Sequence, residues 1–378
     1  MPAVKDKVVT WWIQNVILPQ REIIDKPGFI VTTFTEKKFT TYLREFFIPE
    51  KLFEIIENRI VENYGVKGRQ VLYSSGKKFG YIYASLSNFT TFKNSSAEDI
   101  SKFAYFLVRY IEGTYAQQAE HEADVKQKRF TIYFDNYIIC RHNGIGHIMT
   151  EGGITGIWSY GMQDNSIEGV QLECQGRGNQ RCYIICAPDN EIQEKTKNFF
   201  CEKNLTELKS DLTYKTLNEI QKTTYVKNSL KDLLDAGFFT YKKGIISYKN
   251  NRFFHCESHI LYLLEEEIIK LENGEQILFD SCVEYGKFIA ESYGKKDYQK
   301  FIPDFFSALG FGDILVVDSD ALSIAFIYYP WTIYSKQSKY IILRGIMSGI
   351  VSSLSSEEIR FTNAKVNIEK FLTVTISE

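Results

Sequence analysis

The spacing of hydrophobic and polar residues predicts a chain in which short strands and amphipathic helices alternate. Residues 1–25 carry large apolar side chains with helical spacing and predict a helix. Residues 28–50 predict short strands leading to a helix whose first turn holds Pro49, where a missing N–H needs no helical partner. Residues 51–65 continue this helix, which is expected to end at Gly65.

Helices dominate the next stretch as well. A helix is predicted from Gly68, and Gly76 and Gly80 lie four residues apart on one of its faces. Glycine at such a spacing lets a second helix approach closely. Residues 88–125 are predicted to be mainly helical, and residues 131–141 to form a strand.

The stretch 152–188 combines a glycine-rich apolar segment with a predicted two-stranded ribbon that turns near Gly178. This turn places three pairs of residues opposite one another: Val170 and Cys186, Leu172 and Ile184, and Cys174 and Cys182. Opposed residues of an antiparallel pair hold their Cβ atoms about 4.5 to 5.5 Å apart. Two sulfur atoms at one end of the ribbon are therefore predicted to lie near enough to share a metal ion or a disulfide.

The same order of features returns in the second half of the chain, which predicts an internal repeat. Residues 237–257 parallel residues 28–50, and the helix from Gly274 parallels the helix from Gly68. The equivalent pairs include Gln70 and Gln276, Leu72 and Leu278, Tyr73 and Phe279, Ser75 and Ser281, Gly80 and Gly286, Gly152 and Gly345, and Gly156 and Gly349. On this overlay, Asn363, Phe371 and Thr375 replace the three cysteines of the ribbon.

These patterns predict an α+β protein built by tandem duplication of a domain in which a small antiparallel sheet packs on helices. The first domain is expected at residues 1–188 and the second at residues 237–378. The polar, lysine-rich residues 189–236 are expected to form a helical linker. The two domains are expected to pack as an internal pseudo-dimer, and a homodimer is the alternative.

Composition narrows the functional classes. The 378 residues are 44% hydrophobic and 24% charged, as in globular proteins, and the net charge of -2 offers no basic surface for nucleic acid. No apolar run reaches the roughly eighteen residues of a membrane span, and no signal peptide is apparent. Seven cysteines without a secretion signal indicate reduced thiols, so we expect a cytoplasmic protein and favour metal binding for the cysteine pair.

A metal site at the ribbon needs three or four ligands, and zinc favours thiolate together with imidazole or carboxylate. Cys174 and Cys182 supply two, and His147 is the predicted third. The candidates for a fourth ligand are Gln171, Glu173 and Glu151. Strand alternation turns residues 171 and 173 away from Cys174, so either requires a bulge in the ribbon. Two unligated thiols and a redox pair remain as alternatives, and Cys186 is expected to belong to the core.

Other candidates for chemistry favour a structural role. His121 is expected on a solvated helix face, and His255 and His259 lack a third partner nearby in the sequence. The glycines of residues 144–156 lack the lysine and hydroxyl of a phosphate loop, so we assign them to helix packing. With five histidines and no nucleophile motif, an enzyme is not the first interpretation.

The run from IPEKLFEIIENRIVENYG through VLYSSGKKFG, then GGITG and the Cys-x7-Cys ribbon ending in CYIICAP, resembles the 4-vinyl-reductase domain, also called the hydrocarbon-binding domain. The resemblance covers residues 28–188 and 237–378. It implies an α+β fold related to that of vesicle-trafficking TRAPP subunits, and a role in sensing small molecules, including in transcriptional activators. It also implies a zinc held by the two ribbon cysteines, a glutamate three residues before the first, and an upstream cysteine. Gln171 stands at the glutamate position, and the upstream cysteine position falls near His147.

We therefore expect a sensor or regulatory protein with a structural zinc in its first domain and a hydrophobic small molecule bound among residues 68–86, residues 101–115 and the sheet. No ATPase or DNA-binding region is apparent, so the signal is expected to pass through a protein partner. Two alternatives remain, a scaffold that uses the same fold with a filled core and an accessory enzyme of tetrapyrrole-type metabolism.

Overall fold

The computed structural model describes most of the chain. The described residues are 21–34, 42–87, 89, 91–92, 96–195, 200–205, 223–242, 245–294, 297–318, 321–334, 337–355, 357–367 and 373–378. Residues 1–20 of the predicted N-terminal helix lie outside these ranges. Its last residues, 21–25, belong to strand β1 (Arg21–Lys26), so the helix prediction is wrong there.

The chain divides into two compact units. The first contains Met1–Ile56, Lys209–Tyr241 and Ile246–Glu378, and the second contains Glu57–Leu208 with Lys242–Ile245. These units differ from the sequence repeats because the strands that begin each repeat belong to one sheet in the first unit. The boundaries 1–188, 189–236 and 237–378 stay a prediction about the repeat.

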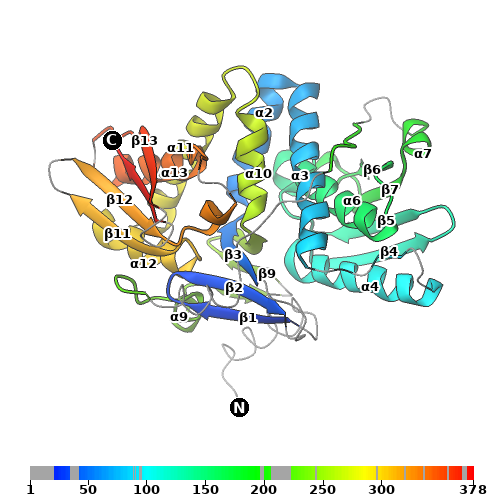
Figure 1. The fold of residues 1–378 in the computed structure, drawn as a ribbon, viewed down its shortest axis with the longest axis horizontal. Helices are drawn as coiled ribbons and strands as arrows, with labels where there is room; N and C mark the ends of the chain where they lie inside the picture. Colours follow the sequence, from blue (N-terminus) through cyan, green and yellow to red (C-terminus); the bar gives the residue numbers. More distant parts are fainter. Residues whose placement is uncertain are drawn as a thin grey trace, which may run out of the picture. The chain divides into compact units, whose positions relative to one another are not determined.

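The second unit holds most of the first repeat (Figure 1). Its elements are the later part of α2 (Lys51–Tyr64), α3 (Val66–Leu86), α4 (Ala97–Thr114), β4 (Gln118–Asp124), β5 (Arg129–Asp135), α5 (Cys140–Asn143), α6 (Ile148–Met162), β6 (Ile167–Glu173), the 3-10 turn η1 (Gln175–Arg177), β7 (Cys182–Pro188) and α7 (Asp189–Gln193). The strands form an antiparallel sheet in the order β4-β5-β7-β6. Helices α3 and α6 pack side by side.

Glycines bring α3 and α6 into backbone contact. A Cβ atom on Gly80 would lie 1.9 Å from the carbonyl oxygen of Gly153, and one on Gly76 would lie 2.0 Å from that of Met149. From the other helix, a Cβ atom on Gly152 would lie 2.3 Å from the carbonyl oxygen of Tyr73. Any side chain larger than hydrogen would separate the helices, which confirms the helix-packing role predicted for these three glycines. Gly144 and Gly146 do not share it, because they lie in left-handed conformations before α6 and face Gly176 and Gln171.

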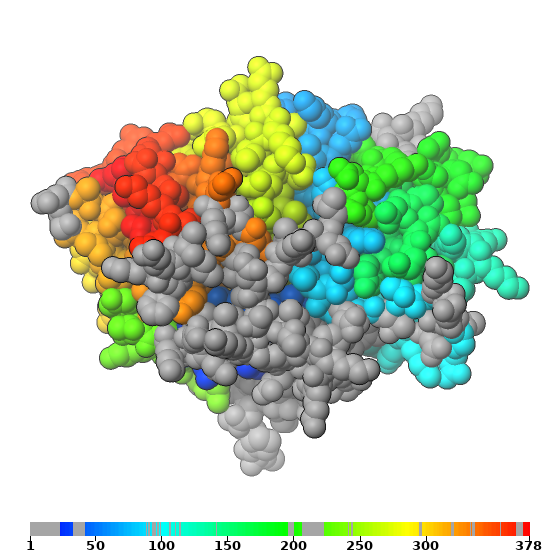
Figure 2. Space-filling model, viewed as in Figure 1, coloured from blue at the N-terminus to red at the C-terminus, as the bar shows by residue number. Residues whose placement is uncertain are grey.

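The first unit holds the second repeat together with the opening strands of the first. Its elements are β1, β2 (Phe29–Phe34), β3 (Tyr42–Pro49), α9 (Leu230–Asp235), β8 (Thr240–Lys242), β9 (Ile245–Tyr248), β10 (Asn251–Glu257), α10 (His259–Ile268), α11 (Gly274–Tyr293), α12 (Tyr298–Ala308), β11 (Asp313–Asp318), β12 (Leu322–Ile327), the 3-10 turn η2 (Pro330–Ile333), α13 (Ile341–Ser355), β13 (Asn363–Asn367) and β14 (Thr373–Ser377). Atoms of β13, in red, are visible on the face seen in Figure 2, and its residues alternate between exposed and half-buried.

Two antiparallel sheets organise this unit. One has six strands in the order β1-β2-β3-β10-β9-β8, in which β3 and β10 pair across its middle. The other has the order β11-β12-β14-β13, which repeats the order β4-β5-β7-β6 of the second unit. Each half of the chain thus runs from a glycine-bearing helix through a hairpin and a second glycine-bearing helix to a ribbon. The α+β class predicted from the sequence, with small antiparallel sheets packed on helices, is confirmed.

Several local predictions were wrong. Of the strand predicted at residues 131–141, residues 131–135 lie in β5, whereas residues 140–141 begin helix α5. Residues 118–124 form the exposed edge strand β4 and not a helix, and Pro49 ends β3. In the second repeat, Asn363 pairs with Ser377 at the end of the ribbon away from its turn, so Asn363 does not occupy the position of Cys174. Phe371 lies outside the described residues. Of the predicted helical linker, the described residues 200–205 and 223–229 are not helical, whereas α7 and α9 are short helices.

No helix among the described residues is both long and apolar enough to cross a membrane.

Candidate metal centre

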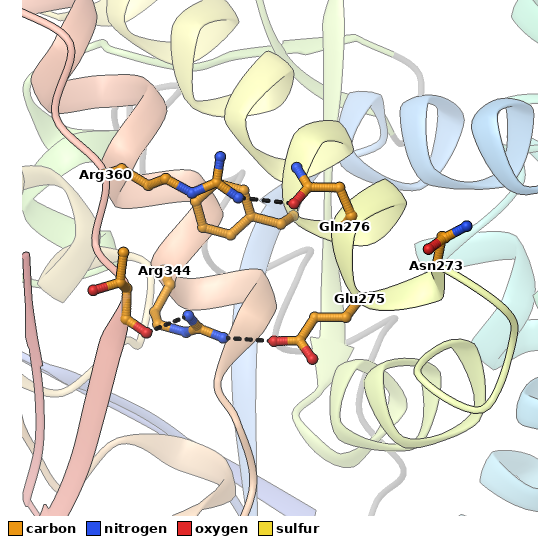
Figure 3. A pocket seen from close by; sticks show the side chains of 7 residues that line it. Asn273, Glu275, Gln276, Arg344 and Arg360 are labelled. Carbon is orange, nitrogen blue, oxygen red and sulfur yellow. Dashed lines mark hydrogen bonds and ion pairs between the residues drawn. The ribbon is translucent and has the colours of Figure 1, made fainter.

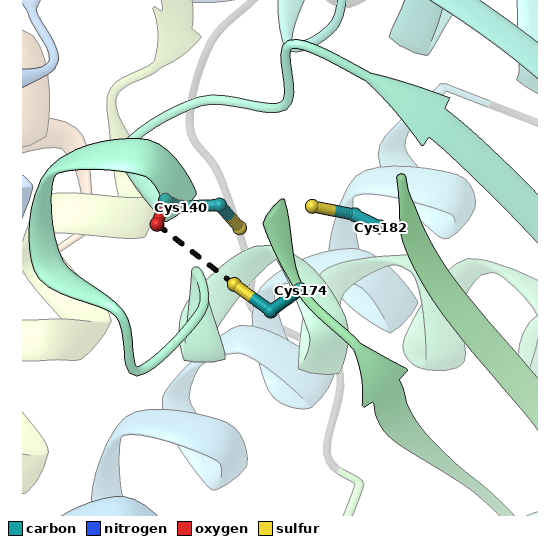
Figure 4. A group of neighbouring side chains, drawn as sticks. All are labelled: Cys140, Cys174 and Cys182. Carbon is teal, nitrogen blue, oxygen red and sulfur yellow. Dashed lines mark hydrogen bonds between the residues drawn. The ribbon is translucent and has the colours of Figure 1, made fainter. Parts of the chain in front are cut away.

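Three buried cysteines converge at the end of the ribbon in the first repeat (Figure 4). The sulfur atoms of Cys140, Cys174 and Cys182 lie within 4.8 Å of one another, and all three residues have 0% exposure. The predicted proximity of Cys174 and Cys182 is therefore confirmed. The third sulfur comes from the short helix α5.

A bulge in the ribbon sets this geometry. Strands β6 and β7 pair Gln171 with Ile184, and the register then shifts so that Glu173 pairs with Tyr183. The extra residue is Leu172, which was predicted to face Ile184. Because of the shift, Gln171 can point to the same face as the cysteines, as the sequence argument required of a fourth ligand.

The turn of the ribbon packs directly on the residue that supplies the third sulfur. A Cβ atom on Gly176 would lie 1.7 Å from the carbonyl oxygen of Cys140, so only glycine fits at that position. The residue before Cys140, Ile139, has a left-handed backbone conformation with φ of 51°. A β-branched residue is seldom found there, and the strained turn brings the start of α5 to the ribbon.

The cysteines fit the requirements of a thiolate metal site. Tetrahedral zinc with Zn–S bonds of about 2.3 Å places its sulfur ligands about 3.8 Å apart, within the observed limit. All seven cysteines of the chain are free of disulfides. No other group of three His, Cys, Asp or Glu residues within the described ranges meets the same proximity criterion.

Gln171 borders the cysteine cluster. Its Nε2 atom lies 3.4 Å from the sulfur of Cys140, and its side chain is 7% exposed. No donor among the described residues bonds its buried Oε1 atom. Gly146, with φ of +90°, makes room for this amide, because a Cβ atom there would lie 2.1 Å from Oε1.

His147 is placed differently. Its Nδ1 atom lies 2.8 Å from Oε1 of Glu57, and the same carboxylate accepts hydrogen bonds from the backbone N–H groups of Ile148 and Met149. His147 therefore takes part in the N-terminal cap of α6, and Cys140 occupies the third position beside the ribbon cysteines. Glu151 is buried in the same helix, and its pKa is raised to about 7 by burial.

The three thiols share hydrogen bonds. Bonds from Cys140 and Cys182 lower the pKa of Cys174, whereas burial raises the pKa of Cys140. The backbone N–H of Gln175 also donates to the sulfur of Cys182, at 3.4 Å. One thiolate is thus favoured within the cluster, and a metal ion bound to all three sulfur atoms would displace the remaining thiol protons.

The remaining sequence candidates take structural positions. Cys186 is buried beside the hydroxyl of Thr155, as a core residue would be. His121 lies on β4, so a helical metal motif is excluded there. His255 lies 3.4 Å from Glu45, and His259 contacts Glu257, inside the first unit.

Sequence reasoning missed Cys140. It stands seven residues before His147 and 34 before Cys174, without a spacing that marks a metal ligand on its own. The signal that could have identified it was the upstream cysteine implied by the family resemblance.

Comparison with known proteins adds little to this site. No family model and no curated protein matches the chain. Among solved structures, the phenol-responsive sensory domain of the transcription activator PoxR, with phenol bound, matches 52% of this chain and 97% of its own. The sequence identity is 16% and the TM-score is 0.36.

Proposed function

We propose that this chain is a non-catalytic, ligand-binding regulatory protein whose first repeat is closed by a structural zinc ion. The observation that carries the proposal is the buried set of Cys140, Cys174 and Cys182, which joins the ribbon to the turn before α6. A set of three thiolates binds zinc in preference to magnesium or calcium, which take oxygen ligands. The relation to the 4-vinyl-reductase domain belongs to this proposal.

Gln171 is the proposed fourth ligand. Rotating its amide by half a turn would exchange Nε2 and Oε1 and bring the oxygen toward the sulfur of Cys140. The unpaired Oε1 atom supports this choice. His147 is assigned to the cap of α6 in place of its predicted ligand role.

The zinc would fix the ribbon, and no reaction is assigned to it. Metal binding is coupled to folding in small thiolate sites, where it contributes on the order of 10 kcal/mol. In this repeat it would hold β6, β7 and α5 together at one end of the sheet.

The proposed ligand is a small hydrophobic molecule bound where aromatic side chains of α3, α4, α6 and β5 meet. Phe103 contacts Phe89 and Phe92, with ring centroids 5.4 and 5.0 Å apart, and Trp158 stacks on Phe130 at 4.8 Å. Flat apolar walls of this kind suit a small neutral aromatic molecule. We propose that the bound state is communicated through a protein partner.

A scaffold without a ligand is the second candidate. The same ring distances favour it, because aromatic side chains at about 5 Å separation already fill the space between the helices.

Two measurements separate these candidates. Native mass spectrometry of the purified chain would reveal a retained small molecule, and calorimetric titration with phenol and toluene would detect binding of neutral aromatics. Saturable binding that is weakened by Phe103→Ala supports the sensor. If no molecule is retained and neither probe binds, the sensor is rejected and the scaffold function is supported.

A further inference from the structure

The second repeat contains a surface pocket of about 330 Å³ that the proposed zinc site and aromatic cluster do not involve (Figure 3). It lies between the first turn of α11, the first turn of α13 and the segment that leads into β13. Its volume is at the lower end of the range for small-molecule sites. Two arginines, Arg344 and Arg360, point toward α11 from the other two elements.

Arg344 is held rigidly at this pocket. It is 9% exposed, its Nε donates to the carbonyl oxygen of Lys339 at 2.9 Å, and its Nη1 donates to that of Thr362 at 2.7 Å. Its Nη2 lies 3.4 Å from Oε1 of Glu275. A guanidinium group has five N–H donors, so Arg344 keeps donors beyond these three bonds.

Arg360 forms the opposite wall. Its guanidinium lies over the ring of Phe279, 4.4 Å from the centroid, and its Nη2 donates to Oε1 of Gln276 at 2.9 Å. Gln276 is neutral, so this hydrogen bond brings no negative charge to Arg360. Stacking and hydrogen bonding together fix the plane of the group at the pocket.

The side chains that line the pocket carry an excess of one positive charge. The lining contains two arginines and one acid, Glu275, which gives 2 − 1 = +1. Just outside, Lys339 bonds Glu275 and Asp280 bonds Gln276, and these two opposite charges cancel. The N-terminus of the 20-residue helix α11 adds a partial positive charge on the same side.

The first repeat does not build this pocket. Aligning the glycines of the paired helices places Arg69 opposite Glu275 and Glu151 opposite Arg344, so the acid and the base are exchanged. Tyr73, which takes the place of Phe279, bonds Glu168. The acid and the base therefore stand on opposite helices in the two repeats, and Phe279 has no hydroxyl to bond an acid as Tyr73 does.

From these features we propose that the pocket binds a small organic monocarboxylate. The carboxylate lies between the two guanidinium groups, whose planar forks match its geometry, and the carbon skeleton lies against Phe279 and the methyl group of Thr362. A single negative charge matches the single excess positive charge.

The test is calorimetric titration of the full chain with benzoate, benzamide and inorganic phosphate at low ionic strength. Benzoate is expected to saturate below about 10 mM, with benzamide, its neutral isostere, about tenfold weaker or more. Equal binding of benzamide, tighter binding of phosphate, or no saturation by benzoate would overturn the proposal.

Two substitutions with opposite expected effects on benzoate affinity test the location of the site. Arg360→Gln is expected to weaken benzoate binding about tenfold, whereas Glu275→Gln, which removes the carboxylate already facing Arg344, is expected to strengthen it several-fold. Arg109→Gln is the matched control, because Arg109 also stacks on a ring, that of Tyr105, and contacts an acid, Glu112. The assignment is contradicted if Arg360→Gln leaves the affinity for benzoate unchanged, or if Glu275→Gln weakens it. Such a result would leave the zinc and the aromatic cluster of the first repeat untouched.

Discussion

The two repeats share a closely packed pair of helices and differ in the buried side chains beside that pair. In both, glycines bring two helices into backbone contact, as Gly80 does on Gly153 and Gly286 does on Ile346. In both, a buried glutamate also caps the second helix of the pair. Glu57 accepts hydrogen bonds at the start of α6, and Glu265 accepts one from the N–H of Ile342 at the start of α13.

The interior of the first repeat carries a buried lysine at a position that is apolar in the second. The buried Nζ of Lys77 lies 2.7 Å from Oε1 of Glu168, and the hydroxyl of Tyr73 donates to Oε2 at 2.6 Å. The glycine alignment places Val283 and Phe279 at the positions of Lys77 and Tyr73. The features common to both helix pairs are therefore the glycine contacts and the glutamate cap. The buried ion pair and the cysteine cluster belong to the first repeat.

The largest expected effect comes from breaking the shared helix contact. Gly152→Ala would put a methyl group 2.3 Å from the carbonyl oxygen of Tyr73 and is expected to lower the free energy of unfolding by about 4 kcal/mol or more. Gly153→Ala is the neighbouring control, because its nearest contact would be an ordinary 3.7 Å and alanine favours helix by about 1 kcal/mol. Urea unfolding of both variants measures the difference, and equal effects would refute the packing argument.

Breaking the buried ion pair is expected to have the next largest effect. Lys77→Met leaves the buried Glu168 without its cation and should destabilise the first repeat by about 3 kcal/mol. The double change Lys77→Met with Glu168→Met should recover much of this loss, because it leaves no unpaired charge and the second repeat has Val283 at the position of Lys77. Lys78→Met, at a partly exposed pair 3.5 Å from Glu202, should change stability by less than about 1 kcal/mol. A double variant as unstable as Lys77→Met would show that the first repeat requires the charges.

The glutamate caps should matter by similar, smaller amounts in both repeats. Glu57→Gln and Glu265→Gln each weaken hydrogen bonds to buried backbone N–H groups and are expected to cost about 1 to 3 kcal/mol. Hydrogen exchange at the first turns of α6 and α13 reports each cap separately. Loss of protection in one repeat only would mean that the two helix starts are not equivalent.

The smallest effect is expected from Tyr73→Phe, which gives the first repeat the side chain of Phe279. Removing the hydroxyl deletes one hydrogen bond to Glu168 and one from the N–H of Gly169, at a cost of about 1 kcal/mol. Phe279→Leu, a control in the second repeat, should leave the unfolding of the first repeat unchanged. If Tyr73→Phe lowers the free energy of unfolding by more than about 3 kcal/mol, the ion pair of Lys77 and Glu168 depends on the Tyr73 hydroxyl.

The sequence predicted those parts of the fold that depend on local pattern. The helix from Lys51, the glycine contacts and the proximity of Cys174 and Cys182 follow from periodicity and turn spacing. Strand β4 was mistaken for a helix because QAEHEAD is polar and rich in helix-favouring residues, and an exposed edge strand has no apolar face to reveal it.

The parts that were missed depend on contacts distant in sequence. The pairing of β3 with β10 joins residues about 200 positions apart, such as Phe47 and His255, and no local signal encodes it. The third sulfur required the left-handed turn at Ile139 and the close approach of Gly176 to Cys140. A bulge at Leu172 turns Gln171 toward the cysteines. No residue pattern predicts this bulge, and only the need for a fourth ligand suggests one.

The measurement that tests the account most directly is the zinc content of freshly purified, reduced protein, compared with Cys140→Ser, Cys174→Ser and Cys182→Ser. The control is Cys282→Ser, which changes a buried cysteine of the second repeat. About one zinc ion per chain is expected in the parent and in the control, and loss of zinc in each of the other three. A parent protein without zinc, or zinc retained when Cys140 is replaced, would contradict the metal centre proposed for the first repeat.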